Sequence, residues 1–263
     1  RPDGTTVRWC FNEAECWSFI GTLFFRNTPT RKIVSHEWPL EGLQYPSSSP
    51  SGRTAACATS DGYYWATNGA QTLVFDNDQW YYLEVTASFG VATTVACEGE
   101  DLFLADKTGT IWRLRQGSIE ENMGYLEAGE IRAIDRTVEG TLYILAETAP
   151  DSDERALYRM ENGVGVKVEL PGDPLLFAFA AITDDDIWAA GTNAIYHWDG
   201  TEWTTTLPAD LADRGLPPGE TAADITRFFA LDADNIWMLG RSPDGTTAYI
   251  FSYDGTKWVN DAR

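Results

Sequence analysis

Short runs of apolar residues, bounded by polar turn-forming residues, recur along the whole chain. They are rich in Trp, Tyr and Phe, whose side chains suit the pleated, half-buried surface of a strand. The 23 Gly and 12 Pro are spread along the chain between these runs, which is typical of turns that separate many short elements. No run of about ten residues or more repeats the i, i+3, i+4, i+7 spacing of an amphipathic helix. The pattern therefore predicts an all-β chain.

One unit recurs through the sequence. Its two clearest copies span residues 187–203 and 236–258, and each contains Ile-Trp, then Gly, then an aromatic-Asp-Gly-x-x-Trp hairpin. Weaker copies lie at 16–25, 64–80, 102–112 and 142–158. With one aromatic of each copy as an anchor, the period is roughly 40 to 50 residues, the length of a propeller blade. We expect these anchors to be largely buried on the second strand of each unit: Trp17, Trp65, Phe103, Tyr143, Trp188 and Trp237.

This period predicts a single six-bladed β-propeller with four antiparallel strands in each blade. A β-sandwich would not explain six copies at one period, and radial closure protects the strand edges of so long an array. No strand from one terminus completes a blade at the other, so we expect the sixth blade to be wholly C-terminal. The expected blades span approximately residues 5–40, 52–86, 89–123, 129–170, 175–208 and 223–261.

The fifth unit shows how one period accommodates four strands. We expect strands at 177–182, 186–190, 194–198 and 203–207. The turns between them include 183–185 and the Asp199-Gly200 hairpin at 199–202. Asp-Gly between apolar alternations is a strong hairpin signal, because Gly accepts a positive φ.

The units at 187–203 and 236–258 resemble the blades of exported bacterial β-propeller repeat proteins. In those blades an Asp-rich turn, Ile-Trp, Gly and a Trp-Asp-Gly-x-x-Trp hairpin recur. The resemblance is strong over these two units, partial over 64–80, and carried by spacing alone elsewhere. It implies the propeller architecture and an extracellular or cell-envelope setting. It implies no ligand, because this fold carries many unrelated functions.

The formal net charge is −21, from 40 acidic and 19 basic residues. Such a surface repels phosphate backbones and anionic membranes, so we expect no nucleic-acid partner. The charge either keeps the protein soluble or attracts a cationic partner or divalent ions. No apolar run is long enough to span a bilayer, so we expect no membrane insertion.

Four cysteines, at positions 10, 16, 57 and 97, suit two disulfides and an oxidising compartment. Cys10 ends one strand of the first hairpin and Cys16 begins the next, which predicts a Cys10–Cys16 bridge. Cys57 and Cys97 fall on the innermost strands of neighbouring blades, where a bridge depends on the spacing between the blades. Four free buried thiols are the alternative.

The chain has few of the residues and motifs that are typical of catalytic sites. It has two histidines, no Gly-x-Ser-x-Gly elbow and no Gly-rich phosphate loop, so we expect neither a cofactor nor a transition-metal site. His197 holds the place in the fifth unit that Ser252 holds in the sixth, which marks it as a scaffold position. We expect His36 on an outer strand, at 32–38.

Acidic residues concentrate at the turns between the first and second strands of the units, as at 184–186, Asp232 and Asp234. Our interpretation is that Asp and Glu shape and solvate tight turns. The alternative is a weak calcium site, which needs roughly six to eight converging oxygens.

Two aromatic pairs also recur, Trp198 with Trp203 and Tyr253 with Trp258. Aromatic faces of this kind stack on sugars in lectins. Because the pairs are equivalent in the repeat, we expect them instead to fill the space between neighbouring blades.

Three segments break the repetition, at 39–53, 146–156 and 208–224. Turns between second and third strands and linkers between blades emerge on one face of a propeller, so we expect these loops, with 66–72, around the channel mouth. Long loops on a rigid scaffold commonly carry binding. The candidate binding residues there are Asn68, Asp106, Lys107, Asp151, Asp153, Arg155, Asn193 and Arg241.

The sequence thus predicts a non-catalytic binding or scaffold module that is secreted, periplasmic or on the cell surface. It would present its irregular loops to a protein or glycan partner. A first alternative is a hydrolase or lyase acting on polysaccharide through carboxylates at the channel mouth. A second is a lectin, which should repeat polar ligand residues from blade to blade, whereas the repeated residues here are apolar.

Overall fold

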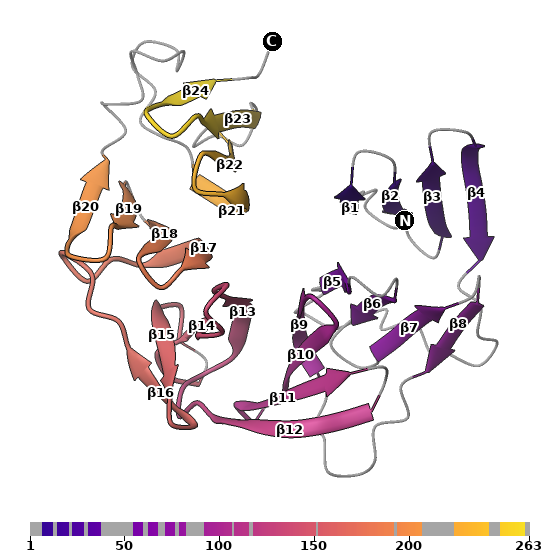
Figure 1. Cartoon of the computed structure of the whole chain (residues 1–263), viewed down its shortest axis with the longest axis horizontal. Helices are drawn as coiled ribbons and strands as arrows, with labels where there is room; N and C mark the ends of the chain where they lie inside the picture. The colour runs from indigo at the N-terminus through magenta and orange to yellow at the C-terminus, as the bar shows by residue number, and fades with distance from the viewer. Residues whose placement is uncertain are drawn as a thin grey trace. The chain divides into compact units, whose positions relative to one another are not determined.

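The computed structural model of the chain is shown in Figure 1. Within the residues that it describes, every regular element is a β-strand, as predicted. The chain divides into two compact units, residues 1–106 with 113–121 and residues 107–112 with 122–263. The described residues are 7–12, 15–20, 23–28, 31–37, 55–59, 63–67, 72–76, 79–82, 92–106, 108–115, 118–150, 152–191, 194–206, 224–241 and 248–260.

In the first unit, strands that follow one another in the chain are also neighbours in the sheets. The first repeat consists of β1 (Val7–Asn12), β2 (Glu15–Ile20), β3 (Leu23–Thr28) and β4 (Arg31–Glu37). The second repeat consists of β5 (Ala55–Ala58), β6 (Tyr64–Thr67), β7 (Thr72–Asp76) and β8 (Gln79–Tyr82). The third repeat begins with β9 (Ala92–Glu98) and β10 (Asp101–Asp106), which form an antiparallel hairpin.

The third repeat continues with β11 (Thr110–Arg115) and β12 (Ser118–Tyr125), in the order β9-β10-β11-β12. These two strands contribute residues to both units. Within the second unit, Tyr125 at the end of β12 pairs in parallel with Val164 at the start of β16.

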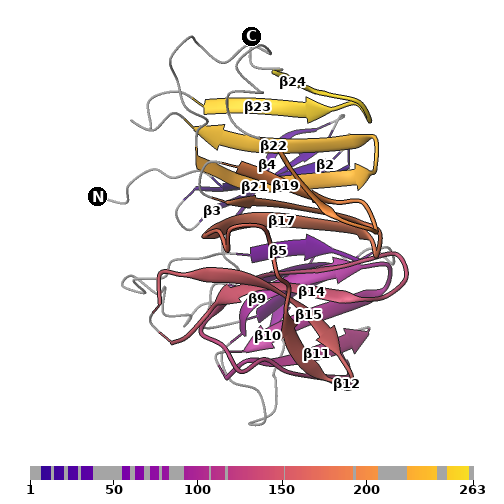
Figure 2. The same ribbon diagram turned by 90° about the vertical axis from the view of Figure 1, so that its left-hand side faces the viewer.

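The second unit contains the fourth, fifth and sixth repeats, each an antiparallel run of strands in chain order. Figure 2 shows β21, β22, β23 and β24 lying one beside the next, so the sixth repeat is formed entirely by C-terminal residues, as predicted. The fourth repeat is β13 (Ile131–Arg136), β14 (Leu142–Glu147), β15 (Arg155–Glu161) and β16 (Val164–Lys167). The fifth is β17 (Leu176–Thr183), β18 (Asp186–Gly191), β19 (Ala194–Trp198) and β20 (Trp203–Thr206). The sixth is β21 (Asp224–Asp232), β22 (Asn235–Arg241), β23 (Ala248–Tyr253) and β24 (Trp258–Asn260).

The fifth repeat matches the prediction from the sequence closely. The strands expected at 177–182, 186–190 and 203–207 each differ from β17, β18 and β20 by one residue at one or both ends. β19 has the predicted bounds. Asp-Gly and Asp-Asp turns therefore fix the strand ends from local sequence alone.

The cross-strand register confirms that the units are equivalent. Trp188 pairs with His197 across β18 and β19, and Trp237 pairs with Ser252 across β22 and β23. His197 therefore occupies the scaffold position predicted for it.

The predicted anchors lie on the second strand of each repeat, and four of them are buried: Trp65, Phe103, Tyr143 and Trp188. Trp237 is partly exposed. It lies on the face of β22 opposite Ile236 and Met238, as Trp188 lies opposite Ile187 and Ala189, but Trp188 packs against the following repeat. The side chain of Trp17 lies outside the described residues.

Two apolar cores lie between neighbouring repeats of the second unit. Because side chains alternate, β18 serves both cores: Ile187 and Ala189 face the fourth repeat, and Trp188 and Ala190 face the sixth. The core between the fourth and fifth repeats includes Tyr143, Leu145, Leu157, Leu176, Ile187, Ala189 and Tyr196. The core between the fifth and sixth includes Trp188, Ala190, Ile195, Ile236, Met238, Phe251 and Trp258.

Candidate functional site

The acidic turn of the fifth repeat bonds to the neighbouring repeat. The hydroxyls of Thr137 and Thr141 donate to Asp184 Oδ1 and Oδ2, at 2.7 and 2.9 Å. The backbone N–H of Asp184 in turn donates to Glu139 Oε2 at 3.0 Å. Thr137 is fully buried. Asp184 therefore fastens the turn between β13 and β14 to the turn between β17 and β18.

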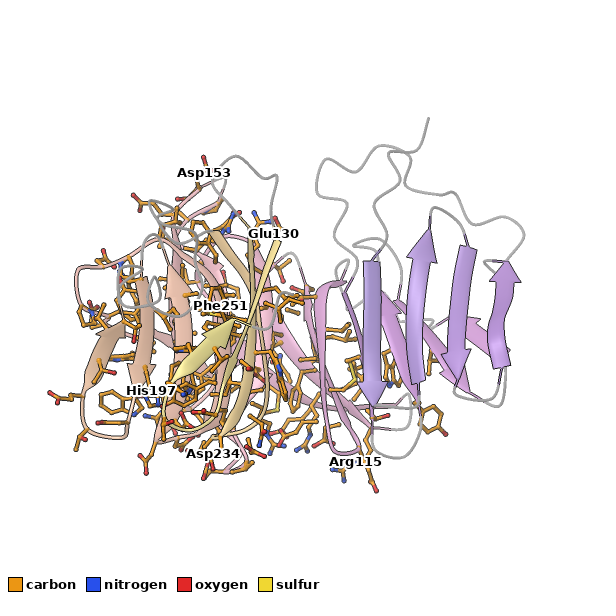
Figure 3. The ribbon with its side chains drawn as sticks, turned by 90° about the horizontal axis from the view of Figure 1, so that it is seen from above. Arg115, Glu130, Asp153, His197, Asp234 and Phe251 are labelled. Carbon is orange, nitrogen blue, oxygen red and sulfur yellow. A yellow bond between two sulfur atoms is a disulfide. The ribbon has the colours of Figure 1, made fainter. Side chains whose placement is uncertain are left out.

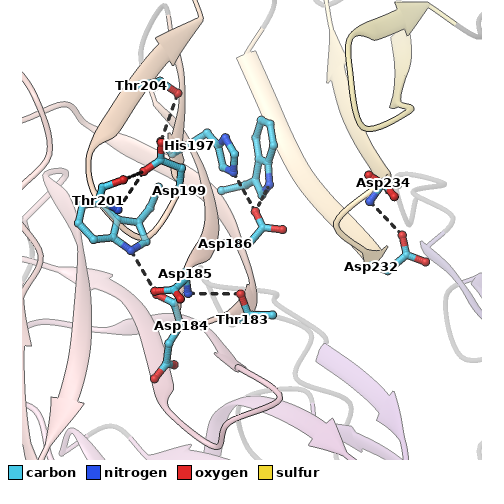
Figure 4. Close-up of polar contacts among 12 residues, drawn as sticks. Thr183, Asp184, Asp185, Asp186, His197, Asp199, Thr201, Thr204, Asp232 and Asp234 are labelled. Carbon is cyan, nitrogen blue, oxygen red and sulfur yellow. Dashed lines mark hydrogen bonds and ion pairs between the residues drawn. The ribbon is translucent and has the colours of Figure 1, made fainter.

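Asp186 orients two rings in the same way (Figure 4). Its Oδ1 accepts a hydrogen bond from Trp188 Nε1 at 2.8 Å and lies 2.9 Å from His197 Nε2. The rings of Trp188 and His197 stack with their centroids 3.9 Å apart and an interplanar angle of 12°. This arrangement packs the indole into the core and gives His197 a structural partner.

The Asp-Gly hairpins of the fifth and sixth repeats have the same internal bonding. Asp199 Oδ1 accepts bonds from Thr201 N, Thr201 Oγ1 and Glu202 N, at 2.9, 2.7 and 2.9 Å. Asp254 Oδ1 accepts the equivalent bonds from Thr256 N, Thr256 Oγ1 and Lys257 N, at 3.0, 2.6 and 3.0 Å. The backbone N–H of Glu202, with the hydroxyl and N–H of Thr201, holds the pKa of Asp199 at about 2.

The glycine of each hairpin is favoured by its backbone conformation. Gly200 and Gly255 have φ values of 88° and 83°, in the left-handed region. A Cβ on Gly200 would also lie 2.9 Å from the side chain of Asp185, and one on Gly255 would meet Asp234 Oδ1, so each aspartate side chain would have to move. The aspartates therefore shape the turns, as the interpretation from the sequence proposed.

The opposite face of the second unit carries a different acidic cluster. Figure 3 shows Glu130 and Asp153 at one end of these strands and Asp234 at the other. Arg132 Nη1 lies 3.0 Å from Glu130 Oε2, and its Nη2 pairs with Glu147 Oε1. Glu147 Oε2 also accepts a bond from Glu130 N at 3.3 Å. Glu147 is buried, so these contacts offset the cost of removing its charge from water.

Above this cluster lies the turn between β14 and β15. Thr148 N donates to Glu154 O at 3.0 Å, and Ser152 Oγ accepts a bond from Glu154 N at 3.1 Å. Asp153 and Glu154 are exposed. The turn is thus closed by its own hydrogen bonds and presents two carboxylates to solvent. We call Asp153, Glu154 and the ion-paired residues Glu130, Arg132 and Glu147 the loop face.

The predicted binding residues are distributed unevenly. Asp153 and Arg155 lie together beside the turn, and the Arg155 guanidinium sits 5.9 Å from the centroid of the Phe177 ring. Asp106 is buried at the end of β10 in the first unit. Arg241 ends β22, where its Cα pairs with those of Asp224 and Ala248. Asn68, Lys107, Asp151, Asn193 and the segments 39–53 and 208–223 lie outside the described residues.

Several residues of the loop face were not among the candidates from the sequence. Glu130, Arg132 and Glu147 belong to regular strands or to the short segment before β13. An Arg placed two residues after a Glu is a weak signal. Their meeting depends on the pairing of β13 with β14, which brings residue 131 opposite residue 146.

A disulfide joins Cys57 on β5 to Cys97 on β9, with the Cα atoms 5.5 Å apart. The innermost strands of the second and third repeats therefore lie within bridging distance, which spacing alone left open. The backbone register pairs Cys10 with Cys16, as the predicted second bridge requires. The side chains of that pair lie outside the described residues, and the bridge remains a prediction.

In the described part of the chain, no group of three or more His, Cys, Asp or Glu side chains could hold a metal ion. No helix there is long and apolar enough to cross a membrane.

No protein-family model and no curated protein sequence matches the chain. Solved structures do. YCF48 bound to a D1 peptide matches with a TM-score of 0.64 and 13% identity, over 99% of this chain and 83% of that one. A catalytically inactive virginiamycin B lyase from Staphylococcus aureus with quinupristin matches with a TM-score of 0.61 and 16% identity, over 97% and 87%. The WD40 β-propeller domain of Doa1 matches with a TM-score of 0.59 and 8% identity, over 96% and 90%.

The fold is that of a β-propeller. At these identities the likeness carries the fold alone, and the propeller's function has to be argued from its own residues.

Proposed function

We propose that this chain is a non-catalytic binding module, a single propeller of six blades whose loop face contacts a partner protein. The blade count is supported by six consecutive runs of four strands and by the equivalent registers of the fifth and sixth repeats. Propellers of known structure include one bound to a peptide, YCF48, so the fold is suited to this use.

The observation that carries the proposal is the contrast between the two faces of the second unit. On one face, the carboxylates of Asp184, Asp186, Asp199 and Asp254 accept hydrogen bonds from their own repeat or from the neighbouring one. On the loop face, Asp153 and Glu154 are exposed above an ion-paired base in which Glu147 is buried. Exposed charge on a rigid base can bind a partner without a large ordering cost.

An enzymatic role on polysaccharide fits the loop face less well. A glycosidase needs one protonated and one ionised carboxyl group on either side of the bond that is cleaved. Glu130 and Glu147 instead both bind the same guanidinium, that of Arg132, so the two carboxylates are engaged with a side chain of the protein.

We place the module outside the cytoplasm. The bridge between Cys57 and Cys97 joins two neighbouring repeats, and such bonds persist in oxidising compartments. Mass spectrometry of the native protein, alkylated without reduction, tests this placement. Four alkylated thiols in protein isolated from its source would contradict it.

Site-specific cross-linking tests the binding face. A photoreactive amino acid replaces Asp153 on the loop face, and in a matched variant it replaces Asp234, which is also exposed but lies on the turn between β21 and β22. We expect position 153 to give a discrete protein adduct in cells of the source organism and position 234 to give none. Adducts of equal yield at both positions, or at neither, would overturn the proposal.

A further inference from the structure

A pocket of about 340 Å³ lies between the fourth and fifth repeats. Its inner wall is apolar and aromatic, formed by Tyr143, Ile187, Val168, Trp198 and Trp203. This volume falls at the lower end of the roughly 300–1,000 Å³ found for ligand pockets. It is large enough for one bulky side chain or one sugar ring.

The two tryptophans form the aromatic side of the pocket. Trp198 and Trp203 face each other across β19 and β20, with ring centroids 5.7 Å apart and an interplanar angle of 46°. Trp198 Nε1 donates to Asp184 O at 3.2 Å, which fixes its indole. Both side chains are partly exposed. The aromatic surface is therefore already in place before any ligand binds.

Exposed aliphatic residues continue the apolar surface beyond the pocket. Val166 lines the pocket and is 44% exposed, and Val164, on the same face of β16, is 60% exposed. Tyr125, which pairs with Val164, is 49% exposed. Contiguous exposed apolar groups of this kind mark surfaces that bind another macromolecule. Aliphatic side chains give a sugar little to hydrogen-bond, so the patch favours a peptide over a glycan.

The lining of the pocket carries two carboxylates, Glu161 and Glu169, and two cations, Arg159 and Lys167. Three further carboxylates add negative charge around it: Asp173 lies 2.7 Å from Lys167 Nζ, and Asp184 and Asp185 are close enough to raise the pKa of Tyr143. Burial raises the pKa of Tyr143, and the nearby carboxylates raise it further against the opposing effect of Arg159.

The two cations at the pocket already have acidic partners. Lys167 bonds to Asp173, and Arg159 Nε lies 4.0 Å from Glu161 Oε1. Together with the net charge of −21, this leaves a field that attracts a basic ligand.

We infer that this pocket binds a large apolar side chain from an extended segment of a partner protein, with a Lys or Arg beside it in that segment. The apolar side chain lies between Trp203 and Val166, and the basic one lies near Glu161 and Glu169. This inference rests on the proposed binding function and adds a second contact region, distinct from the loop face, on the side of the propeller.

Selection from a library of random short peptides displayed on phage, with the full chain as target, tests the inference. We expect the enriched peptides to share a large apolar residue next to Lys or Arg. Synthetic copies are then titrated against variants by tryptophan fluorescence. Val166→Lys should weaken binding at least about tenfold, since it removes apolar surface and repels a basic ligand.

The matched control is Val259→Lys. Val259 is 37% exposed on β24, the outermost strand of the sixth repeat, so the same change there should leave the affinity unaltered. Trp203→Ser is the second pocket variant, and it should also weaken binding at least about tenfold. Val166→Lys, at an exposed position, keeps the test valid if Trp203→Ser fails to fold.

The outcomes separate this inference from the proposed function. If the peptides bind Val166→Lys and the wild type equally but do not bind an Asp153→Lys, Glu154→Lys double variant, the inference about the pocket is overturned. The proposed role of the loop face is then retained. A pocket that binds a soluble oligosaccharide, sensitive to Val166→Lys, and selects no peptide is a carbohydrate site instead. A selection that enriches no peptide also overturns the inference, and the cross-linking at position 153 then decides the proposed function alone.

Discussion

Among the described residues, the junction between the fifth and sixth repeats buries its hairpin tryptophan in an apolar core, and we call it the filled junction; the equivalent junction between the fourth and fifth repeats contains a pocket. Trp258 and Trp203 hold the same place in the two hairpins, yet Trp258 is 3% exposed and Trp203 is partly exposed. At the filled junction the Trp188 ring lies edge-on to Trp258, with centroids 5.4 Å apart. The two tryptophan-bearing hairpins are similar because the unit repeats. The residues that face each hairpin from the preceding repeat decide whether a pocket remains beside its tryptophan.

Two substitutions in the opposite wall explain the difference. Tyr143 stands in the fourth repeat where the fifth has Trp188, and Arg159 stands where the fifth has His197. His197 stacks on Trp188 and closes the filled junction. Arg159 is exposed and lies near Glu161, so the space beside the smaller Tyr143 stays open. A binding site can therefore arise in a repeat fold when one repeat carries different residues from the next at two equivalent positions.

The largest effect should come from the two equivalent tryptophans. Trp258→Ala removes a buried indole and should lower the free energy of unfolding by about 3–5 kcal/mol. Trp203→Ala should cost roughly half as much, because its ring is already partly hydrated. Urea denaturation followed by circular dichroism measures both. Equal losses would mean that the two junctions do not differ as described.

A third junction, between the second and third repeats, is held covalently. Cys57 and Cys97 are separated by 40 positions, and a bridge that closes such a loop should contribute about 4 kcal/mol by restricting the unfolded chain. The Cys57→Ser, Cys97→Ser variant should lose stability on this scale in urea. If reduction of the wild-type protein left its unfolding midpoint unchanged, the bridge would have no role in holding the two repeats.

The acidic residues of the two faces should differ in their effect on folding. Asp184→Ala leaves the hydroxyls of Thr137 and Thr141 without their acceptor and should cost about 1–3 kcal/mol. Asp153→Ala, on the exposed turn, should change stability by less than about 0.5 kcal/mol. Thermal unfolding of the two variants side by side measures the difference. A destabilised Asp153→Ala would assign the loop face a structural role.

The pocket itself can be converted into a filled junction. Tyr143→Trp with Arg159→His gives the fourth repeat the pair that the fifth has in Trp188 and His197. We expect a gain of about 1 kcal/mol in the free energy of unfolding, since the added ring occupies existing space. The same variant should no longer bind the selected peptides. Loss of stability without loss of binding would contradict our explanation of the pocket.

Much of the scaffold was predictable because it repeats. The Asp199-Gly200 hairpin, the equivalence of His197 with Ser252 and the strand bounds of the fifth repeat all follow from comparing two copies of one unit. Local turn chemistry and side-chain alternation are sufficient for these features.

The pocket and the loop face were not predictable in this way. Trp198 and Trp203 were expected to fill the space between blades, and they do pack on the core there, but whether space remains depends on Tyr143 and Arg159 in another repeat. The Glu130–Arg132–Glu147 cluster likewise requires the register of β13 with β14. Both depend on which side chains meet across repeats or strands.

The smallest effect should appear in acid, at the hairpins that both repeats share. Hydrogen bonds lower the pKa of three aspartates. The pKa of Asp199 falls to about 2 from 3.8, chiefly because the N–H of Glu202 donates to it. The pKa of Asp254 is lowered chiefly by the Thr256 hydroxyl, and that of Asp232 chiefly by the Asn235 amide. The stability that a lowered pKa contributes is fully present above about pH 4 and is lost as the pH falls toward the folded-state pKa. Between pH 4 and pH 2 the wild-type protein should therefore lose stability more steeply than a variant with all three aspartates changed to Asn, whose neutral amide oxygens still accept the turn bonds. Urea midpoints measured across this range compare the two slopes, and parallel slopes would show that the turns contribute nothing that depends on charge.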